Sequence, residues 1–193
     1  MPSKAEVREA VWRALEEAGA AAFPGPRGRI PNFRGSGQAA ERLRTLPEWR
    51  RARAIKCNPD YAQRAVRLRA LQDGKVVYVA VPRLRGERPF LELDPARLGA
   101  RLREAITIGG AERLGRHVAV EDLPPIDLIV AGTVAADRTG ARIGKGGGYS
   151  DLEYALLRSA GKVGEDTVIV TTVHPLQVVD GPLPADPHDI SLD

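Results

Sequence analysis

The residue types best suited to chemistry lie together in one glycine-rich segment, residues 137–151 (DRTGARIGKGGGYSD). Its closely spaced glycines are Gly144, Gly146, Gly147 and Gly148. Glycines let backbone N–H groups approach an anion, and a helix that begins after them adds partial positive charge. Arg142 and Lys145 would stabilise phosphate oxygens during transfer, and the Asp151 carboxylate is a suitable ligand for magnesium. The segment therefore predicts a phosphate site with Arg142 and Lys145 as catalytic cations.

Two commoner phosphate loops do not match this segment. A G-x-x-x-x-G-K-[ST] loop would need glycine where Thr139 stands, and a G-x-G-x-x-G loop would need glycine where Tyr149 stands. Glycine clusters also form flexible turns that bind nothing, and the spacing alone leaves that alternative open.

A strand is expected directly before the glycine-rich segment and a helix directly after it. The apolar run at 126–132 predicts a buried strand, and residues 151–160 predict the helix. Further strands are expected at 54–57, 75–81 and 167–173, and further helices at 3–21, 38–45, 47–53, 60–73 and 95–106. Strands that alternate with helices predict an α/β fold with a mostly parallel sheet covered on both faces, in which ligands bind at the carboxyl ends of strands.

Proline and glycine set the expectations for the remaining segments. Residues 23–37 hold three prolines and four glycines, which predict a surface loop or lid. Residues 183–193 are expected to be a loop that leads into a strand beyond the end of the sequence.

Composition limits the class of protein. The 193 residues suit one domain, residues 1–193, and no apolar run approaches the roughly 18 residues of a membrane span. The charged N-terminus lacks the apolar stretch of a secretory signal, so a cytoplasmic protein without a membrane partner is expected. One cysteine and three histidines offer no structural zinc pattern. The net charge of +4 favours anionic partners, but no RNA-binding pattern supports nucleic acid as one of them.

The pattern D-x-x-G-x-R-x-G-K-G-x-G-Y-x-D at 137–151 resembles the signature of the 5-formyltetrahydrofolate cyclo-ligases, also called methenyltetrahydrofolate synthetases. Lys4 and Arg8 resemble the basic pair of that family's N-terminal K-x-x-L-R, which contacts ATP phosphates. The segments at 74–83 and 127–130 are similar to the family's "GK…PR" and "DLI" strands, and 183–189 is similar to its closing segment.

This resemblance implies a three-layer α/β/α sandwich, ATP and Mg²⁺ as cofactors, and a reduced folate as substrate. In the family, ATP phosphorylates the formyl oxygen of 5-formyltetrahydrofolate, N10 attacks, and phosphate leaves to give 5,10-methenyltetrahydrofolate. Asp151 and Asp189 would then bind metal, Asp60 and Tyr61 substrate, and the cofactor would contact Lys4, Arg8, Gly144, Gly146, Gly147, Gly148 and Tyr149.

The chain also departs from the family's pattern. Ser150 and Leu152 stand where the family has a second tyrosine and an arginine, and Asp60 is the one acidic residue left on the substrate side. A non-catalytic nucleotide- or folate-binding protein on the same fold therefore remains the alternative. The sequence predicts no oligomeric state.

Overall fold

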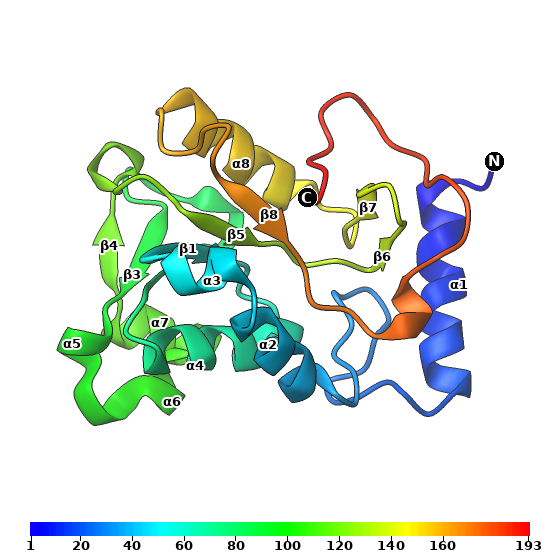
Figure 1. Ribbon diagram of the computed structural model, residues 1–193, viewed down its shortest axis with the longest axis horizontal. Coiled ribbons are helices and arrows are strands. Elements are labelled where there is room, and N and C mark those ends of the chain that lie inside the picture. The colour runs from blue at the N-terminus through cyan, green and yellow to red at the C-terminus, as the bar shows by residue number, and fades with distance from the viewer.

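A six-stranded sheet forms the centre of the molecule, and helices lie on both of its faces (Figure 1). The computed structural model describes residues 1–193. The strands of this sheet are β1 (Ala54–Cys57), β2 (Val76–Ala80), β3 (Phe90–Leu93), β4 (Arg116–Val118), β5 (Leu128–Val130) and β8 (Val168–Val170). Their order across the sheet is β4-β3-β2-β1-β5-β8. A separate hairpin joins β6 (Ala135–Ala136) to β7 (Arg142–Ile143).

The inner part of the sheet is parallel, as predicted. Strand β1 pairs in parallel with β2 and with β5, and β5 pairs in parallel with β8. Strands β3 and β4 extend the sheet at one edge in the antiparallel direction, and the sequence did not predict either of them. Both are short, so their sequences carry only a weak strand pattern.

The helices are α1 (Lys4–Glu17), α2 (Ser36–Arg44), α3 (Pro47–Arg51), α4 (Arg64–Gln72), α5 (Pro95–Leu98), α6 (Leu102–Ala105), α7 (Ile108–Leu114) and α8 (Tyr149–Ser159). The prediction of one helix over 95–106 is wrong, because Gly99, at φ +54°, interrupts it between α5 and α6. Helix α7 was not predicted. None of the helices is both long and apolar enough to cross a membrane.

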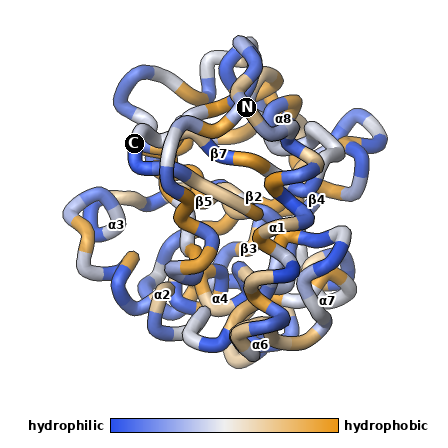
Figure 2. The backbone as a smooth tube through the Cα atoms, turned by 90° about the vertical axis from the view of Figure 1, so that its right-hand side faces the viewer, coloured by the Kyte–Doolittle hydropathy of each residue, from blue (hydrophilic) through white to orange (hydrophobic).

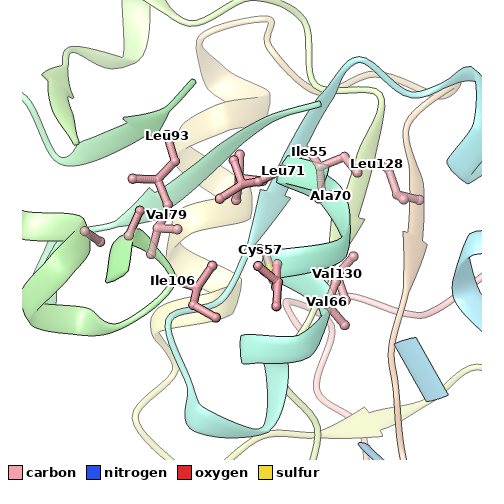
Figure 3. Packing of buried hydrophobic residues seen from close by; sticks show 14 of the residues in the cluster. Ile55, Cys57, Val66, Ala70, Leu71, Val79, Leu93, Ile106, Leu128 and Val130 are labelled. Atoms are coloured by element: carbon pink, nitrogen blue, oxygen red, sulfur yellow. The ribbon is translucent and has the colours of Figure 1, made fainter. Parts of the chain in front are cut away.

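Two apolar clusters fill the spaces between the layers. One lies between the sheet and helices α2 to α7, and Figure 3 shows Cys57 and Val130 of the strands facing Val66 and Leu71 of α4. The other lies between the opposite face of the sheet and α8, where Leu157 is fully buried. Strands β2 and β5 are coloured mainly as hydrophobic in Figure 2. The predicted three-layer arrangement is therefore confirmed.

Helix α1 lies outside these layers and packs against the β6–β7 hairpin (Figure 1). Ser3 begins the helix with a capping box, in which its side chain and that of Glu6 each bind the other's backbone N–H. The buried stripe of Val7, Val11 and Leu15 belongs to the same cluster as Ile143 of β7. This packing brings α1 beside the segment that follows β7.

Arg67 of α4 is a buried cation that fastens two loops to each other. Its guanidinium donates to the carbonyl oxygens of Asn58 (2.5 Å) and Asp60 (3.0 Å) and, from the other edge, to that of Ile106 (2.9 and 3.1 Å). Burial lowers the pKa of Arg67, although arginine remains charged in proteins. The loop after β1 is thereby held against the loop between α6 and α7.

We expect Arg67→Met to lower the free energy of unfolding by about 2–4 kcal/mol, because buried carbonyl oxygens would lose their donors. Urea denaturation measures the loss. Arg69→Met is the matched control, since Arg69 lies on the same helix and pairs with exposed Glu41. Equal losses in the two variants would show that Arg67 does not hold these loops.

Candidate functional site

A cavity of about 290 Å³ opens where β1 and β2 end and α8 begins. Its wall includes eight of the residues that the sequence singled out: Asp60, Arg142, Gly144, Lys145, Gly147, Gly148, Tyr149 and Asp151. The remaining predicted residues, Lys4, Arg8, Gly146, Tyr61 and Asp189, do not line it. The glycine-rich segment and the loop after β1 therefore meet at one cavity.

The glycine-rich loop presents a row of backbone donors at the start of α8. Gly148, at φ +67°, is the N-cap, and Gly146, at φ +110°, allows the turn before it. The backbone N–H groups of residues 144–151 donate no hydrogen bond to any protein acceptor. These N–H groups and the positive end of the helix dipole are available to an anion.

Lys145 and Asp60, which the sequence assigned to different roles, form an ion pair across the cavity. The distance from Lys145 Nζ to Asp60 Oδ1 is 3.2 Å. Asp60 is the more buried partner, and its carboxylate lies so close to Gly132 that a Cβ at that position would stand 3.0 Å from Oδ2. The close approach of Gly132 therefore helps to place Asp60 in reach of Lys145.

Arg142 is buried and points at protein groups. Its guanidinium donates to the Gly132 carbonyl oxygen and to Asp151 Oδ1, both at 3.0 Å. The backbone N–H of Ile190 donates to the same Oδ1 (3.1 Å). The other carboxylate oxygen, Asp151 Oδ2, accepts no hydrogen bond from the protein. The structure thus brings Asp151 next to the C-terminal segment that carries Asp189.

Lys4 reaches that segment from α1. Its Nζ lies 2.5 Å from Asp189 Oδ2 and 2.7 Å from Asp186 Oδ2. Partial burial alone would lower the pKa of Lys4, but hydrogen bonds with the two carboxylates raise it. Burial would likewise raise the pKa of Asp189, but the Asp186 N–H and Lys4 lower it. Ligand atoms of Asp186, His188 and Asp189 lie within 4.8 Å of one another.

Arg8 and Tyr61 lie at the margins of the cavity. Arg8 Nε donates to the Gly144 carbonyl oxygen (2.7 Å), and its guanidinium is 3.5 Å from the place of a Cβ on Gly146. The exposed ring of Tyr61 packs edge-on against Phe23, with centroids 5.5 Å apart, and Arg64 lies over it. Arg8 therefore supports the loop directly, and Tyr61 belongs to a neighbouring aromatic surface.

Asp137, the first residue of the glycine-rich pattern, is a structural residue. Its Oδ1 accepts hydrogen bonds from Thr139 and from the Ala141 N–H, and its Oδ2 accepts one from the Leu183 N–H. Burial would raise the pKa of Asp137, but these hydrogen bonds lower it. Asp137 thereby ties the turn between β6 and β7 to the C-terminal segment.

Sequence analysis did not predict the polar network at the floor of the cavity, and it named Ser150 only as a departure from the family's pattern. Lys56 and Glu153 form a buried ion pair, Lys56 Nζ donates to Asn58 Oδ1 (3.0 Å), and Asn58 Nδ2 donates to Ser150 Oγ (2.8 Å). A lysine within an otherwise apolar buried strand was the one signal available in the sequence.

Comparison with known proteins places these features in a family. The family model for 5-formyltetrahydrofolate cyclo-ligases matches residues 1–193. The chain belongs to the 5-formyltetrahydrofolate cyclo-ligase family. Its resemblance to that family, first drawn from residues 137–151, is thereby confirmed.

The relatives of this cyclo-ligase family member include vertebrate proteins called methenyltetrahydrofolate synthase domain-containing protein. The chain is 40% identical to the one from Bos taurus, 41% to that from Mus musculus and 36% to that from Danio rerio, in each case over 99% of this chain. It spans about half the length of these relatives (51–52%).

A solved structure shares the fold. The NMR structure of Aquifex aeolicus 5,10-methenyltetrahydrofolate synthetase matches with a TM-score of 0.57 at 24% identity, over 98% of this chain and 87% of that one. This likeness confirms the α/β architecture.

Lys4→Met should loosen the C-terminal segment, because α1 would lose its ion pairs to Asp186 and Asp189. We expect hydrogen exchange in residues 183–193 to accelerate about fivefold at neutral pH. Arg13→Met, on the same helix, is the control. Unchanged exchange in Lys4→Met would contradict the anchoring role.

The pH dependence of wild-type exchange should follow the two shifted pKa values. Asp189 has a folded pKa below its unfolded value of about 3.9, so its stabilisation is present above that pH and is lost as pH falls through the folded value. Lys4 has a raised pKa, so its stabilisation is present below about 10.4 and is lost as pH rises through the folded value.

Proposed function

We propose that this protein is an ATP- and magnesium-dependent cyclo-ligase that converts 5-formyltetrahydrofolate to 5,10-methenyltetrahydrofolate. The observation that carries the proposal is the row of unpaired backbone N–H groups at 144–151, which adjoins Lys145 inside a cavity at the carboxyl ends of parallel strands. In this chemistry ATP supplies a phosphoryl group that activates the formyl oxygen toward attack by N10.

The residues of the glycine-rich loop fit the triphosphate of a nucleotide such as ATP. The N–H groups of Gly144 to Gly148 would hold phosphate oxygens, and the positive end of α8 would add to their field. Lys145 is half-exposed and paired with a single carboxylate oxygen of Asp60, so its ammonium has donors left for a phosphate. We assign Lys145 the catalytic role of stabilising charge on the transferring group.

Arg142 and Arg8 support this site in different ways. Arg142 is committed to Gly132 and Asp151, so we assign it the positioning of Asp151 instead of direct contact with phosphate. Arg8 donates one hydrogen bond to Gly144 from Nε and keeps its two terminal nitrogens beside Gly146. We propose that those nitrogens contact the phosphates.

The carboxylates near the loop fit magnesium by their chemistry. Magnesium prefers oxygen ligands and binds through one or two carboxylates together with phosphate oxygens. Asp151 lines the cavity and has a free Oδ2, and the Asp189 carboxylate lies on the adjoining segment. Asp151 would hold the ion directly. Asp189 would contribute only after exchanging Lys4 for the metal.

The other wall of the cavity suits the ring system of a reduced folate. Val81, Pro82 and Ile108 give it an apolar surface, and Tyr149 stands at its edge. Asp60 also lines the cavity and pairs with Lys145, so we propose that its carboxylate meets the folate beside the cation that faces the phosphate. We assign Asp60 to the substrate side, with Tyr61 at the rim.

A non-catalytic nucleotide- or folate-binding protein is the second candidate. Two observations favour it. Leu152 is exposed where the family has an arginine, and each carboxylate proposed for metal is already paired with a cation, Asp151 with Arg142 and Asp189 with Lys4.

Lys145→Ala should lower turnover about 100-fold while thermal stability stays unchanged, because one preorganised charge near the transferring group would be lost. The assay follows the absorbance of the methenyl product with 5-formyltetrahydrofolate, ATP and magnesium. Lys162→Ala is the control, since the Lys162 ammonium donates its one hydrogen bond to the Glu121 carbonyl oxygen, outside the cavity. A wild type that binds Mg-ATP but forms no product would support the second candidate.

Asp151→Asn should weaken ATP binding about tenfold in the presence of magnesium and much less in its absence, because a carboxylate ligand to a hard cation would be lost. Calorimetric titration with and without magnesium measures the difference. Asp166→Asn, at an exposed position, is the control. Equal losses under both conditions would assign Asp151 to holding Arg142 and Ile190 alone.

A further inference from the structure

The floor of the cavity carries a chain of hydrogen bonds with a fixed direction. Lys56 can only donate, so the amide oxygen of Asn58 must face it and the amide nitrogen must face Ser150. Ser150 Oγ accepts that hydrogen bond, and its own hydroxyl proton donates to no protein group. Ser150 lines the cavity, so the chain ends in a donor available to a ligand.

Glu153 offers a hydrogen-bond acceptor beside the Ser150 donor. Its Oε2 pairs with Lys56, and its Oε1 accepts no hydrogen bond within the protein. A carboxylate that is paired with an ammonium presents its oxygens as hydrogen-bond acceptors. Ser150 and Glu153 are three residues apart on α8, a spacing that places both side chains on one face of the helix.

Burying an ion pair beneath a cavity costs desolvation free energy, and apolar side chains could fill the same space without that cost. Replacing such a pair by apolar side chains is often neutral or stabilising, so Lys56 and Glu153 are not explained by stability alone. Both Asn58 and Glu153 line the cavity, while Lys56 lies behind them. The network therefore serves to fix which groups face the cavity as donor and which as acceptor.

We propose that Ser150 and Glu153 select a heterocycle with a lactam edge, in which a carbonyl oxygen stands next to a ring N–H. The serine hydroxyl would donate to the carbonyl oxygen, and the glutamate would accept from the N–H. The pteridine ring of a folate has this edge, and in that part the inference rests on the proposed function. The guanine base of a nucleotide has the same edge and is the other source of this chemistry.

Pairs of ligands that differ in the order of hydrogen-bond donor and acceptor along this ring edge test the proposal. Folic acid and its 4-amino-4-deoxy analogue form one pair, and guanosine and adenosine form the other. In each pair the second member places a donor where the first has its acceptor. We expect the wild type to bind folic acid at least about tenfold more tightly than the analogue, because reversal leaves hydrogen-bonding groups mismatched.

Variants at the floor of the cavity should change the preference for folic acid over its 4-amino-4-deoxy analogue and leave the phosphate site intact. Glu153→Gln introduces an N–H donor, so the preference should fall about tenfold or reverse, while Mg-ATP binding stays within about twofold. Ser150→Ala should reduce the preference more weakly. If Glu153→Gln fails to fold, the double variant Lys56→Met with Glu153→Leu removes the pair without leaving a lone buried charge and should abolish the preference. Glu121→Gln, at an exposed position, is the control.

The outcomes separate this inference from the proposed function. A wild type that discriminates neither pair, or floor variants that keep the full preference, would overturn the inference and leave the cyclo-ligase proposal standing. Discrimination of guanosine from adenosine alone would support the lactam edge and contradict folate as the ligand. If the wild type discriminates between the two folates and Glu153→Gln abolishes that discrimination, both the inference and the cyclo-ligase proposal are supported.

Discussion

A buried cation needs a partner at close range, and this requirement determines how the site is built. Lys56, Arg67 and Arg142 are almost completely buried, and each is neutralised or hydrogen-bonded by groups that surround the cavity. Lys56 binds β1 to α8 through Glu153, Arg67 holds the loop after β1, and Arg142 holds Asp151. The elements around the cavity are thus fixed by polar contacts that tolerate little displacement, because an unpaired buried charge is costly.

This rigid base explains why the glycine-rich loop above it can remain open. The loop needs no internal hydrogen bonds to keep its place, since β7 enters it from one side, α8 leaves it on the other, and Arg8 contacts Gly144. Its N–H groups are therefore available to a ligand without reorganisation, and such preorganisation is the main source of electrostatic stabilisation in enzymes. Binding and positioning are divided between the loop and the buried cations below it.

The sequence predicted what is local and missed what depends on topology. The glycine-rich pattern, the parallel strands and the amphipathic α1 are contiguous in the chain, so their residue types alone indicated them. The floor of the cavity is different: Asn58 and Ser150 are separated by 92 residues and meet only because β1 ends where α8 begins. The same applies to Lys4, whose partners lie at the other end of the chain, whereas β3 and β4 were missed because each is short.

Phosphate binding by the open N–H groups at 144–151 is the step on which the proposed function depends. Two-dimensional NMR of the ¹⁵N-labelled protein tests this binding, with Mg-ATP added in one titration and adenosine, at the same magnesium concentration, in another. We expect the largest amide shift changes with Mg-ATP to fall in residues 144–151 and adenosine to produce few of them. Shift changes of equal size with both ligands, or changes centred elsewhere in the chain, would contradict it.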